Sequence, residues 1–266
     1  MQRRRFLTAS LAAGAVSAMG LGRDGEAQAA KGPREYYQIR KYGFVSGPQT
    51  QLAQGYFKDA LIPALTKMGL GPVGVFSADY GPETPAYYVL IPGNSAEMLA
   101  EVDLKLAEDA EFLKLAEPFW SAPATAPGFQ RVEYSLLKAF EGWPKLTLPA
   151  SSATKAKRIF QMRTYESPSY RDHVRKVEMF NSGEFAIFKT AGLESVFYGD
   201  TLIGSRMPSL TYMLALNNLE ELNGKWDKFG NDPEWKKLSS EQRFSFEPIV
   251  SNITNLVLTP LSCSQI

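Results

Sequence analysis

The sequence contains two copies of one unit, and this repeat limits the possible folds more than any other feature. Residues 37–42 align with residues 160–165, an offset of 123 positions. The same offset aligns Gly69 and Leu70 with Gly192 and Leu193, and it aligns Asp109, Glu111 and Lys114 with Asp232, Glu234 and Lys237. One fixed offset over so many Gly, Asp and aromatic matches indicates an internal duplication. Both copies are therefore expected to fold in the same way.

Each copy shows the same series of strand and helix patterns. Alternating Tyr and Ile side chains predict a strand. The next segment is predicted to be a helix that ends at Gly69, and Pro63 must kink this helix or begin a second piece of it. Asn94, with Glu97 three residues later, is expected to cap a second helix, and Asp109 a short third one. The expected elements of the first copy are a strand at 36–42, a helix at 49–68, strands at 72–78 and 86–92, the two capped helices and a strand at about 130–138.

This order, β-α-β-β-α-β, is that of a ferredoxin-like α+β unit with an antiparallel sheet and its helices on one face. The other face of each sheet would remain bare, so the two sheets are expected to pack together as a pseudo-twofold barrel. The expected domains are residues 34–140 and 158–261, joined by a linker at 141–157.

Several segments of the sequence resemble the NIPSNAP family, within the dimeric α/β-barrel superfamily. The resemblance lies in residues 160–165, 188–193, 210–214, 232–235 and 255–261, and extends more weakly over about 34–261. It implies two ferredoxin-like halves whose sheets form a barrel. It supplies no catalytic residues, because the superfamily includes cofactor-free monooxygenases, isomerases and haem-handling enzymes.

The N-terminal residues have the layout of an export signal. Arg3, Arg4 and Arg5 precede a mildly apolar stretch at 7–21, and small residues follow at 27–29. Because paired arginines followed by Phe-Leu resemble a twin-arginine signal, residues 1–29 are expected to direct export to the periplasm or the outside. The alternative is an ordinary secretory signal.

Composition excludes several classes of site and partner. The chain has one Cys, one His and a net charge of +1. A disulfide framework and a metal site with two His ligands are therefore excluded, and no field favours nucleic acid. No metal or cofactor is predicted, and no transmembrane segment is expected in the mature chain. The partner is expected to be an unidentified small molecule or protein, and a homodimer is an open possibility.

The first strand of each copy carries a Gln-x-Arg-x-Tyr pattern, whose residues share one face of the strand because side chains alternate. If the helices cover the apolar side, these polar residues line the barrel interior, where an Arg can hold a carboxylate ligand. The alternative is that each Arg pairs with a carboxylate of the protein such as Glu133 or Glu194, or simply orders the interface between the sheets. The candidate ligand-binding residues are Gln38, Arg40, Tyr42, Gln161, Arg163 and Tyr165.

The single histidine and the single cysteine are weaker candidates. His173 falls early in a helix among charged residues, so it is expected to be exposed, although a haem ligand or a general base is conceivable. Cys263 is expected in a frayed tail.

Two functions remain open at this point. The first is an exported binding or interaction protein without chemistry of its own. The alternative is a cofactor-independent monooxygenase or isomerase, in which Arg163 and Tyr165 orient an oxyanion and His173 moves a proton. An enzyme would show a cavity of a few hundred Å³ into which Arg163 and Tyr165 reach.

Overall fold

The computed structural model describes residues 32–266, apart from 46, 79 and 82. The expected export signal at 1–29 lies outside the described residues. Residues Gly32–Ile266 form one compact unit. Among the described residues, no helix combines the length and the apolar character needed to cross a membrane.

The first half of this unit runs from β1 to β4. Its helix after β1 contains a π-helical turn, η1, and continues through Pro63 in the first turn of α2. The elements are β1 (Tyr36–Gly43), α1 (Gly47–Tyr56), η1 (Phe57–Leu61), α2 (Ile62–Lys67), β2 (Gly74–Ala78), β3 (Ala86–Gly93), α3 (Ala96–Ala100), α4 (Val102–Leu106), α5 (Ala110–Trp120) and β4 (Arg131–Ala139).

The second half runs from β5 to β8 and repeats this order. Both β1 and β3 recur as β5 and β7 after 123 residues, and a π-helical turn again interrupts the first helix. The elements are β5 (Ile159–Glu166), α7 (Tyr170–Met179), η2 (Phe180–Glu184), α8 (Phe185–Ala191), β6 (Glu194–Ile203), β7 (Ser209–Leu216), α9 (Leu219–Asn231), α10 (Pro233–Ser240), η3 (Gln242–Phe244), α11 (Phe246–Ile249) and β8 (Asn252–Pro260). Between the halves lies the short helix α6 (Ala150–Thr154).

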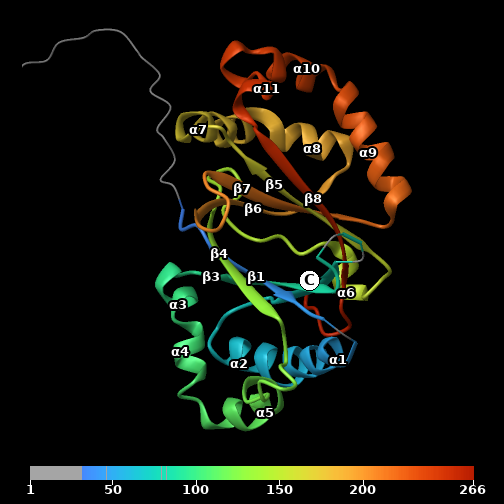
Figure 1. The fold of residues 1–266 in the computed structure, drawn as a ribbon. Coiled ribbons are helices and arrows are strands. Elements are labelled where there is room, and N and C mark those ends of the chain that lie inside the picture. Colours follow the sequence, from blue (N-terminus) through green and yellow to red (C-terminus); the bar gives the residue numbers. More distant parts are fainter. Residues whose placement is uncertain (1–31, 46, 79, 82) are drawn as a thin grey trace, which may run out of the picture. The chain divides into compact units, whose positions relative to one another are not determined.

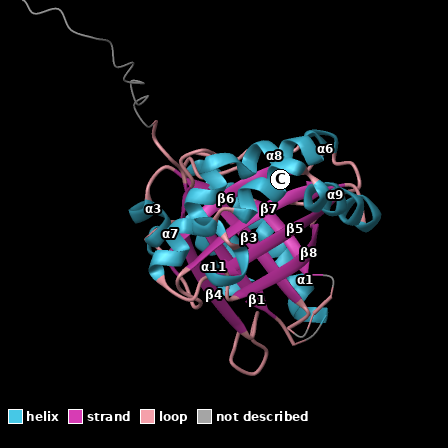
Figure 2. Cartoon of the chain, turned by 90° about the horizontal axis from the view of Figure 1, so that it is seen from above, coloured by secondary structure: helices cyan, strands magenta, loops and turns pink. Residues whose placement is uncertain are grey.

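The eight strands form a closed antiparallel barrel in the order β1-β3-β2-β8-β5-β7-β6-β4. Each half contributes four neighbouring strands, and the halves join where β2 pairs with β8 and where β4 pairs with β6. Helices of the first half cover one side of the barrel and helices of the second half the opposite side (Figures 1 and 2). The predicted fold class is therefore confirmed, and the barrel closes within one chain.

Three apolar clusters hold this arrangement together. One lies between sheet and helices in the first half, one lies in the same place in the second half, and the third fills much of the barrel interior. The third cluster joins Tyr37 and Ile39 of β1 to Phe160 and Met162 of β5. The bare faces of the two sheets thus bury each other, as the duplication predicts.

The structure corrects two local predictions. The cap of α3 is Ser95 rather than Asn94, because Ser95 has an extended backbone and its Oγ accepts from the Met98 amide at 3.1 Å. Asn218 caps α9 at the position 123 residues later. Asp109 caps α5 as predicted, and Asp232, which the repeat aligns with Asp109, caps α10.

The chain after β8 is also packed rather than frayed. Gln265 exchanges hydrogen bonds with the backbone of Val73, and the Ile266 side chain is buried in the barrel interior. Cys263 is half-buried against the apolar cluster of the first half. Burial also raises the pKa of its thiol, which disfavours a reactive thiolate.

Candidate functional site

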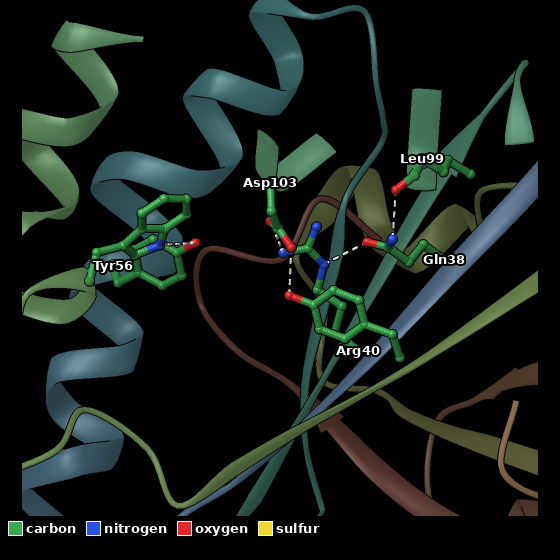
Figure 3. A network of polar contacts seen from close by, with 7 residues as sticks. Gln38, Arg40, Tyr56, Leu99 and Asp103 are labelled. Atoms are coloured by element: carbon green, nitrogen blue, oxygen red, sulfur yellow. Dashed lines mark hydrogen bonds and ion pairs between the residues drawn. The ribbon is translucent and has the colours of Figure 1, made fainter. Parts of the chain in front are cut away.

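The Gln-x-Arg-x-Tyr residues of β1 face the helices, not the barrel interior, so the expectation that they line the barrel is wrong. Gln38 donates to the Leu99 carbonyl of α3 at 2.7 Å (Figure 3). The Tyr42 ring packs 5.1 Å from the ring of Phe57. The opposite face of β1, with Tyr37 and Ile39, packs into the apolar cluster in the barrel interior. Both faces of each strand are buried, so alternation alone did not show which face pointed inward.

Arg40 is the centre of a buried polar network in the first half. Its side chain is 1% exposed. One guanidinium nitrogen donates to Asp103 Oδ1 of α4 at 2.8 Å, and Nε donates to Gln38 Oε1 at 2.6 Å (Figure 3). Tyr134 donates to the other Asp103 oxygen at 2.7 Å. The Arg is thus paired with a carboxylate, as the alternative interpretation held, but the carboxylate is Asp103.

Neither of the two carboxylates suggested from the sequence pairs with these arginines in the contacts of the described residues. Glu133 faces Lys41, with its Oε1 3.9 Å from the Lys41 Nζ, on the barrel side of the sheet. Glu194 accepts a hydrogen bond from the Ala150 amide at 3.2 Å.

The equivalent residues of the second half also lie between sheet and helices. The Arg163 guanidinium stacks 4.3 Å from the centre of the Trp226 ring, and Trp226 Nε1 donates to Gln161 Oε1 at 2.7 Å. Tyr165 and Tyr212 share a hydrogen bond of 2.9 Å between their hydroxyls. Trp226 stands 123 residues after Asp103, so an aromatic ring replaces the carboxylate. Arg163 and Tyr165 therefore do not reach into the barrel.

His173 is buried, so the expectation of an exposed helix histidine is wrong. Its side chain near the start of α7 has its Nε2 2.7 Å from Asp200 Oδ1 on β6. This contact places the imidazole on the outer, helix-covered side of the barrel wall. His173 is not among the residues that line the barrel cavity described below.

Sequence reasoning missed a buried ion pair in the second half. Lys176 Nζ of α7 lies 2.8 Å from Glu184 Oε2 at the end of η2, and the two side chains are 0% and 2% exposed. Burial lowers the pKa of Lys176 and raises the pKa of Glu184, and the attraction between them opposes both effects. Lys176 shares a helix face with buried His173 and Met179. The sequence signal for this ion pair was a lysine on the same helix face as the apolar Met179.

The barrel interior opens into a cavity of about 620 Å³ at the end where β1 and β5 finish. We call it the mouth cavity. Both halves line it, and Ile39, Met162 and Leu256 join it to the apolar barrel core. Its other principal lining residues are Lys41, Ala78, Glu83, Ala86, Tyr88, Glu133, Ser135, Thr164, Thr201, Arg206, Ser209, Thr211 and Thr254.

The two walls of the mouth cavity differ in chemistry. On the first-half wall, Lys41 of β1 is flanked by its direct cross-strand partners Tyr88 of β3 and Glu133 of β4. On the second-half wall, Thr164 of β5 is flanked in the same way by Thr211 and Thr254. Thr164 and Thr211 share a hydrogen bond of 2.8 Å between their hydroxyls.

The charges of the mouth cavity are largely paired within the protein. Lys41 contacts the Glu83 carboxylate, and this hydrogen bond lowers the pKa of Glu83. Arg206 donates to Thr254 Oγ1 at 2.9 Å and lies 3.5 Å from Glu166. Burial, with smaller contributions from Glu83 and Glu133, raises the pKa of Tyr88 to about 12. The Tyr88 phenol therefore stays protonated near neutral pH and acts as a hydrogen-bond donor.

Sequence reasoning did not single out Lys41 and Tyr88. Lys41 belongs to the aligned segment at 37–42, but the repeat aligns it with Thr164, so it is not among the residues that the two copies share. The sequence signal that could have identified Lys41 was this difference between aligned positions, a lysine in one copy and a threonine in the other. Elsewhere in the described part of the chain, no group of three or more His, Cys, Asp or Glu residues is arranged to hold a metal ion.

Comparisons with known proteins agree with this architecture. Residues 160–265 match the NIPSNAP family model, so the second half of the chain is similar to that family. A comparison with curated proteins finds no significant match. A NIPSNAP-like domain protein from Burkholderia xenovorans has 20% identity and a TM-score of 0.35, and the alignment covers 40% of this chain and 86% of that one.

Two solved structures align with both halves, each named a "putative monooxygenase". For the protein from Lactobacillus acidophilus, the TM-score is 0.53 at 9% identity, over 85% of this chain and 94% of that one. For the protein from Fusobacterium nucleatum, the TM-score is 0.56 at 6% identity, over 86% and 93%. Identities this low show the fold alone, which is the dimeric α/β-barrel type.

Proposed function

We propose that this chain, whose second half matches the NIPSNAP family, binds a small neutral organic molecule in its mouth cavity. The observation that carries this proposal is the cavity itself. Its volume of about 620 Å³ lies within the range of small-molecule sites. An apolar floor of Ile39, Met162 and Leu256 meets walls rich in hydroxyl groups and paired charges, so the cavity offers a ligand both apolar surface and hydrogen-bonding groups.

The pairing of charges supports a neutral ligand. Lys41 contacts Glu83 and has Glu133 within 4 Å, and Arg206 contacts Thr254 and Glu166. An ionic ligand would have to displace one of these contacts. A neutral ligand leaves them in place and gains from burial of its apolar surface.

The first-half wall supports a carbonyl or hydroxyl group on the ligand. The Tyr88 hydroxyl is kept protonated, and the Lys41 ammonium lies beside it on the next strand. Both donate hydrogen bonds, so an oxygen acceptor on the ligand would be directed to this wall. One hydrogen bond to a charged donor contributes about 1.5–3 kcal/mol.

Calorimetric titration of the chain with 2-tetralone and with tetralin tests this proposal. The two probes have the same ring system, but only 2-tetralone carries a carbonyl. We expect 2-tetralone to bind at least about tenfold more tightly, the equivalent of about 1.4 kcal/mol. Ser135→Phe fills the mouth cavity and should abolish binding. Ser182→Phe, in a separate surface hollow between α8 and α10, is the matched control. Unchanged binding in Ser135→Phe would refute the proposal.

The second candidate function is an enzyme, either a cofactor-independent monooxygenase or an isomerase. The row of Tyr88, Lys41 and Glu133 favours it, because a proton donor and a carboxylate face the same cavity. Chemistry in the cavity would use this row, because Arg163, Tyr165 and His173 lie on the far side of the barrel wall.

We also propose that residues 1–29 direct export, on the basis of the sequence pattern alone. Expression of the full chain with the Arg3 and Arg4 pair changed to Lys tests this: the wild type should appear outside the cytoplasm in a shorter form, whereas the variant should stay inside. A homodimer stays a prediction. The mouth cavity does not require one, because a single chain supplies both walls.

A further inference from the structure

We infer that the first-half wall of the mouth cavity moves a proton at the carbon next to a ketone, with Glu133 as the base and Tyr88 and Lys41 as donors to the oxygen. This inference rests on the proposed binding function and names both the substrate class and the reaction class. The substrate is a neutral ketone with a C–H bond next to the carbonyl, and the reaction is reversible proton transfer at that carbon through an enolate.

The geometry places the three groups at one level of the barrel. Lys41 is the direct cross-strand partner of Tyr88 on one side and of Glu133 on the other. Directly paired side chains have Cβ atoms about 5 Å apart. A ketone of one or two rings lying across β3, β1 and β4 therefore meets all three side chains at once.

Tyr88 and Lys41 are suited to stabilise a developing enolate oxygen. The raised pKa of Tyr88 keeps its phenol protonated, and Lys41, a hydrogen-bond donor, lies directly across from it on the adjacent strand. Fixed donors directed at an oxygen that gains charge stabilise the transition state more than the ground state. Replacing one such donor typically slows a reaction by about 100-fold or more.

Glu133 is better placed as the base than Glu83. Glu83 accepts a hydrogen bond from Lys41, which lowers its pKa and makes it a weaker base. Glu133 Oε1 lies 3.9 Å from Lys41 Nζ, beyond hydrogen-bond distance, and half of its side chain is exposed. Its carboxylate can therefore turn to a ligand without breaking the Lys41–Glu83 contact.

The proton transfer balances without an added oxidant. The bond between the α-carbon and its hydrogen breaks, and the proton moves to the Glu133 carboxylate. The electron pair of that bond forms a carbon–carbon double bond, and the carbonyl π pair moves to the oxygen, which accepts hydrogen bonds from Tyr88 and Lys41. Glu133 then returns the proton to the same carbon or to a conjugated one.

The second-half wall has no equivalent chemistry. The row of Thr164, Thr211 and Thr254 carries hydroxyls that do not ionise near neutral pH, and Thr164 and Thr211 are already hydrogen-bonded to each other. The Arg206 side chain on this wall already contacts Thr254 and Glu166. These side chains are suited to contact the part of the ligand that does not react. The reaction is thus expected on the first-half wall only, although the backbone of the barrel repeats in both halves.

Exchange of the α-protons of 2-tetralone for deuterium in D₂O, followed by proton NMR near neutral pD, tests the inference. The wild type should accelerate exchange clearly over buffer alone. Glu133→Gln should slow the enzymatic rate by about 100-fold or more, because general base catalysis contributes at least that factor. Its affinity for 2-tetralone should change by less than about threefold, which separates loss of the base from loss of binding or folding. Tyr88→Phe should slow exchange by about 100-fold or more, because it removes one of the two donors to the oxygen.

Two matched controls lie outside the cavity. Glu117→Gln and Tyr170→Phe change exposed side chains of α5 and α7 and should exchange as fast as the wild type. If 2-tetralone binds without accelerated exchange, or if Glu133→Gln exchanges as fast as the wild type, the inference is wrong and the binding function stands. If 2-tetralone does not bind, both are wrong.

Discussion

The two halves of the barrel keep the same polar residues on their first strand but give them different partners. In the first half, the Arg40 guanidinium is hydrogen-bonded to the Asp103 carboxylate. In the second half, the Arg163 guanidinium stacks on the Trp226 ring, which comes from the equivalent position. A carboxylate and an indole both stabilise a buried guanidinium. The buried arginine is thus common to both halves, whereas its partner is a carboxylate in one half and an indole ring in the other.

The inward faces of the same strands differ much more. The row of Tyr88, Lys41 and Glu133 in the first half is matched by three threonines in the second. This difference does not follow from the fold, because both halves present the same backbone register. The helix-facing residues thus belong to the structure that both halves share, and the difference between the inward faces supports our proposal that the first-half wall recognises the ligand.

The largest expected effect concerns an ion pair that only the second half has. Lys176→Met leaves the Glu184 carboxylate buried without its cation, and the expected loss is about 3–5 kcal/mol in the free energy of unfolding. The first half has Ala53 and Leu61 at the equivalent positions. The double variant Lys176→Met with Glu184→Leu should therefore be within about 1 kcal/mol of the wild type or more stable. Urea unfolding of both variants measures this, and equal losses in both would contradict it.

The next effect is alkaline destabilisation, which is expected in both halves. Burial raises the pKa of Tyr42 and Tyr165, the latter to about 12. Because the unfolded chain releases these protons near pH 10, stability is full below pH 10 and falls as the pH rises toward 12. The loss is up to about 1.4 kcal/mol per pH unit for Tyr165. Urea unfolding at pH 8 to 11 measures it, and Tyr165→Phe should flatten the slope. A flat profile in the wild type would contradict burial of these phenols.

Removing the two arginines sharpens the comparison directly. Arg40→Met breaks a buried ion pair whose carboxylate is one-third exposed, so we expect a loss of about 2 kcal/mol. Arg163→Met removes a stacked cation, and we expect about 1 kcal/mol. Thermal unfolding of each variant, with 2-tetralone titration in parallel, checks both values. The affinity for 2-tetralone should not change. A loss of affinity without a loss of stability would show that these arginines bind the ligand.

The smallest effect should be the same in both halves. Ser95→Ala and Asn218→Ala each remove one helix cap, at positions 123 residues apart, and each should cost about 1 kcal/mol. Chemical unfolding of the two variants measures the difference between them. If the two losses in the free energy of unfolding differed by more than about 1 kcal/mol, the two caps would not be equivalent in the two halves.

The duplication made the fold predictable. The same order of strands and helices in both copies indicates two sheets, and each sheet has one apolar face that its own helices do not cover. The site was harder to predict. Strand β1 buries both faces, so Gln38, Arg40 and Tyr42 looked as suitable for the barrel interior as Tyr37, Ile39 and Lys41. Which face a helix covers depends on contacts between distant segments, such as Arg40 with Asp103, and local alternation carries no information about these. His173 was misjudged for the same reason, because Asp200 lies far from it in sequence.

Exchanging the chemistry of the two walls is the most direct test of the central claim, that ligand recognition belongs to the first-half wall. The triple variant Lys41→Thr, Tyr88→Thr, Glu133→Thr gives the first half the side chains of the second, and Thr164→Val, Thr211→Val, Thr254→Val is its matched counterpart. Calorimetric titration with 2-tetralone should show an affinity loss of about tenfold or more in the first variant and less than about threefold in the second. Equal losses, or a larger loss in the threonine variant, would contradict the account.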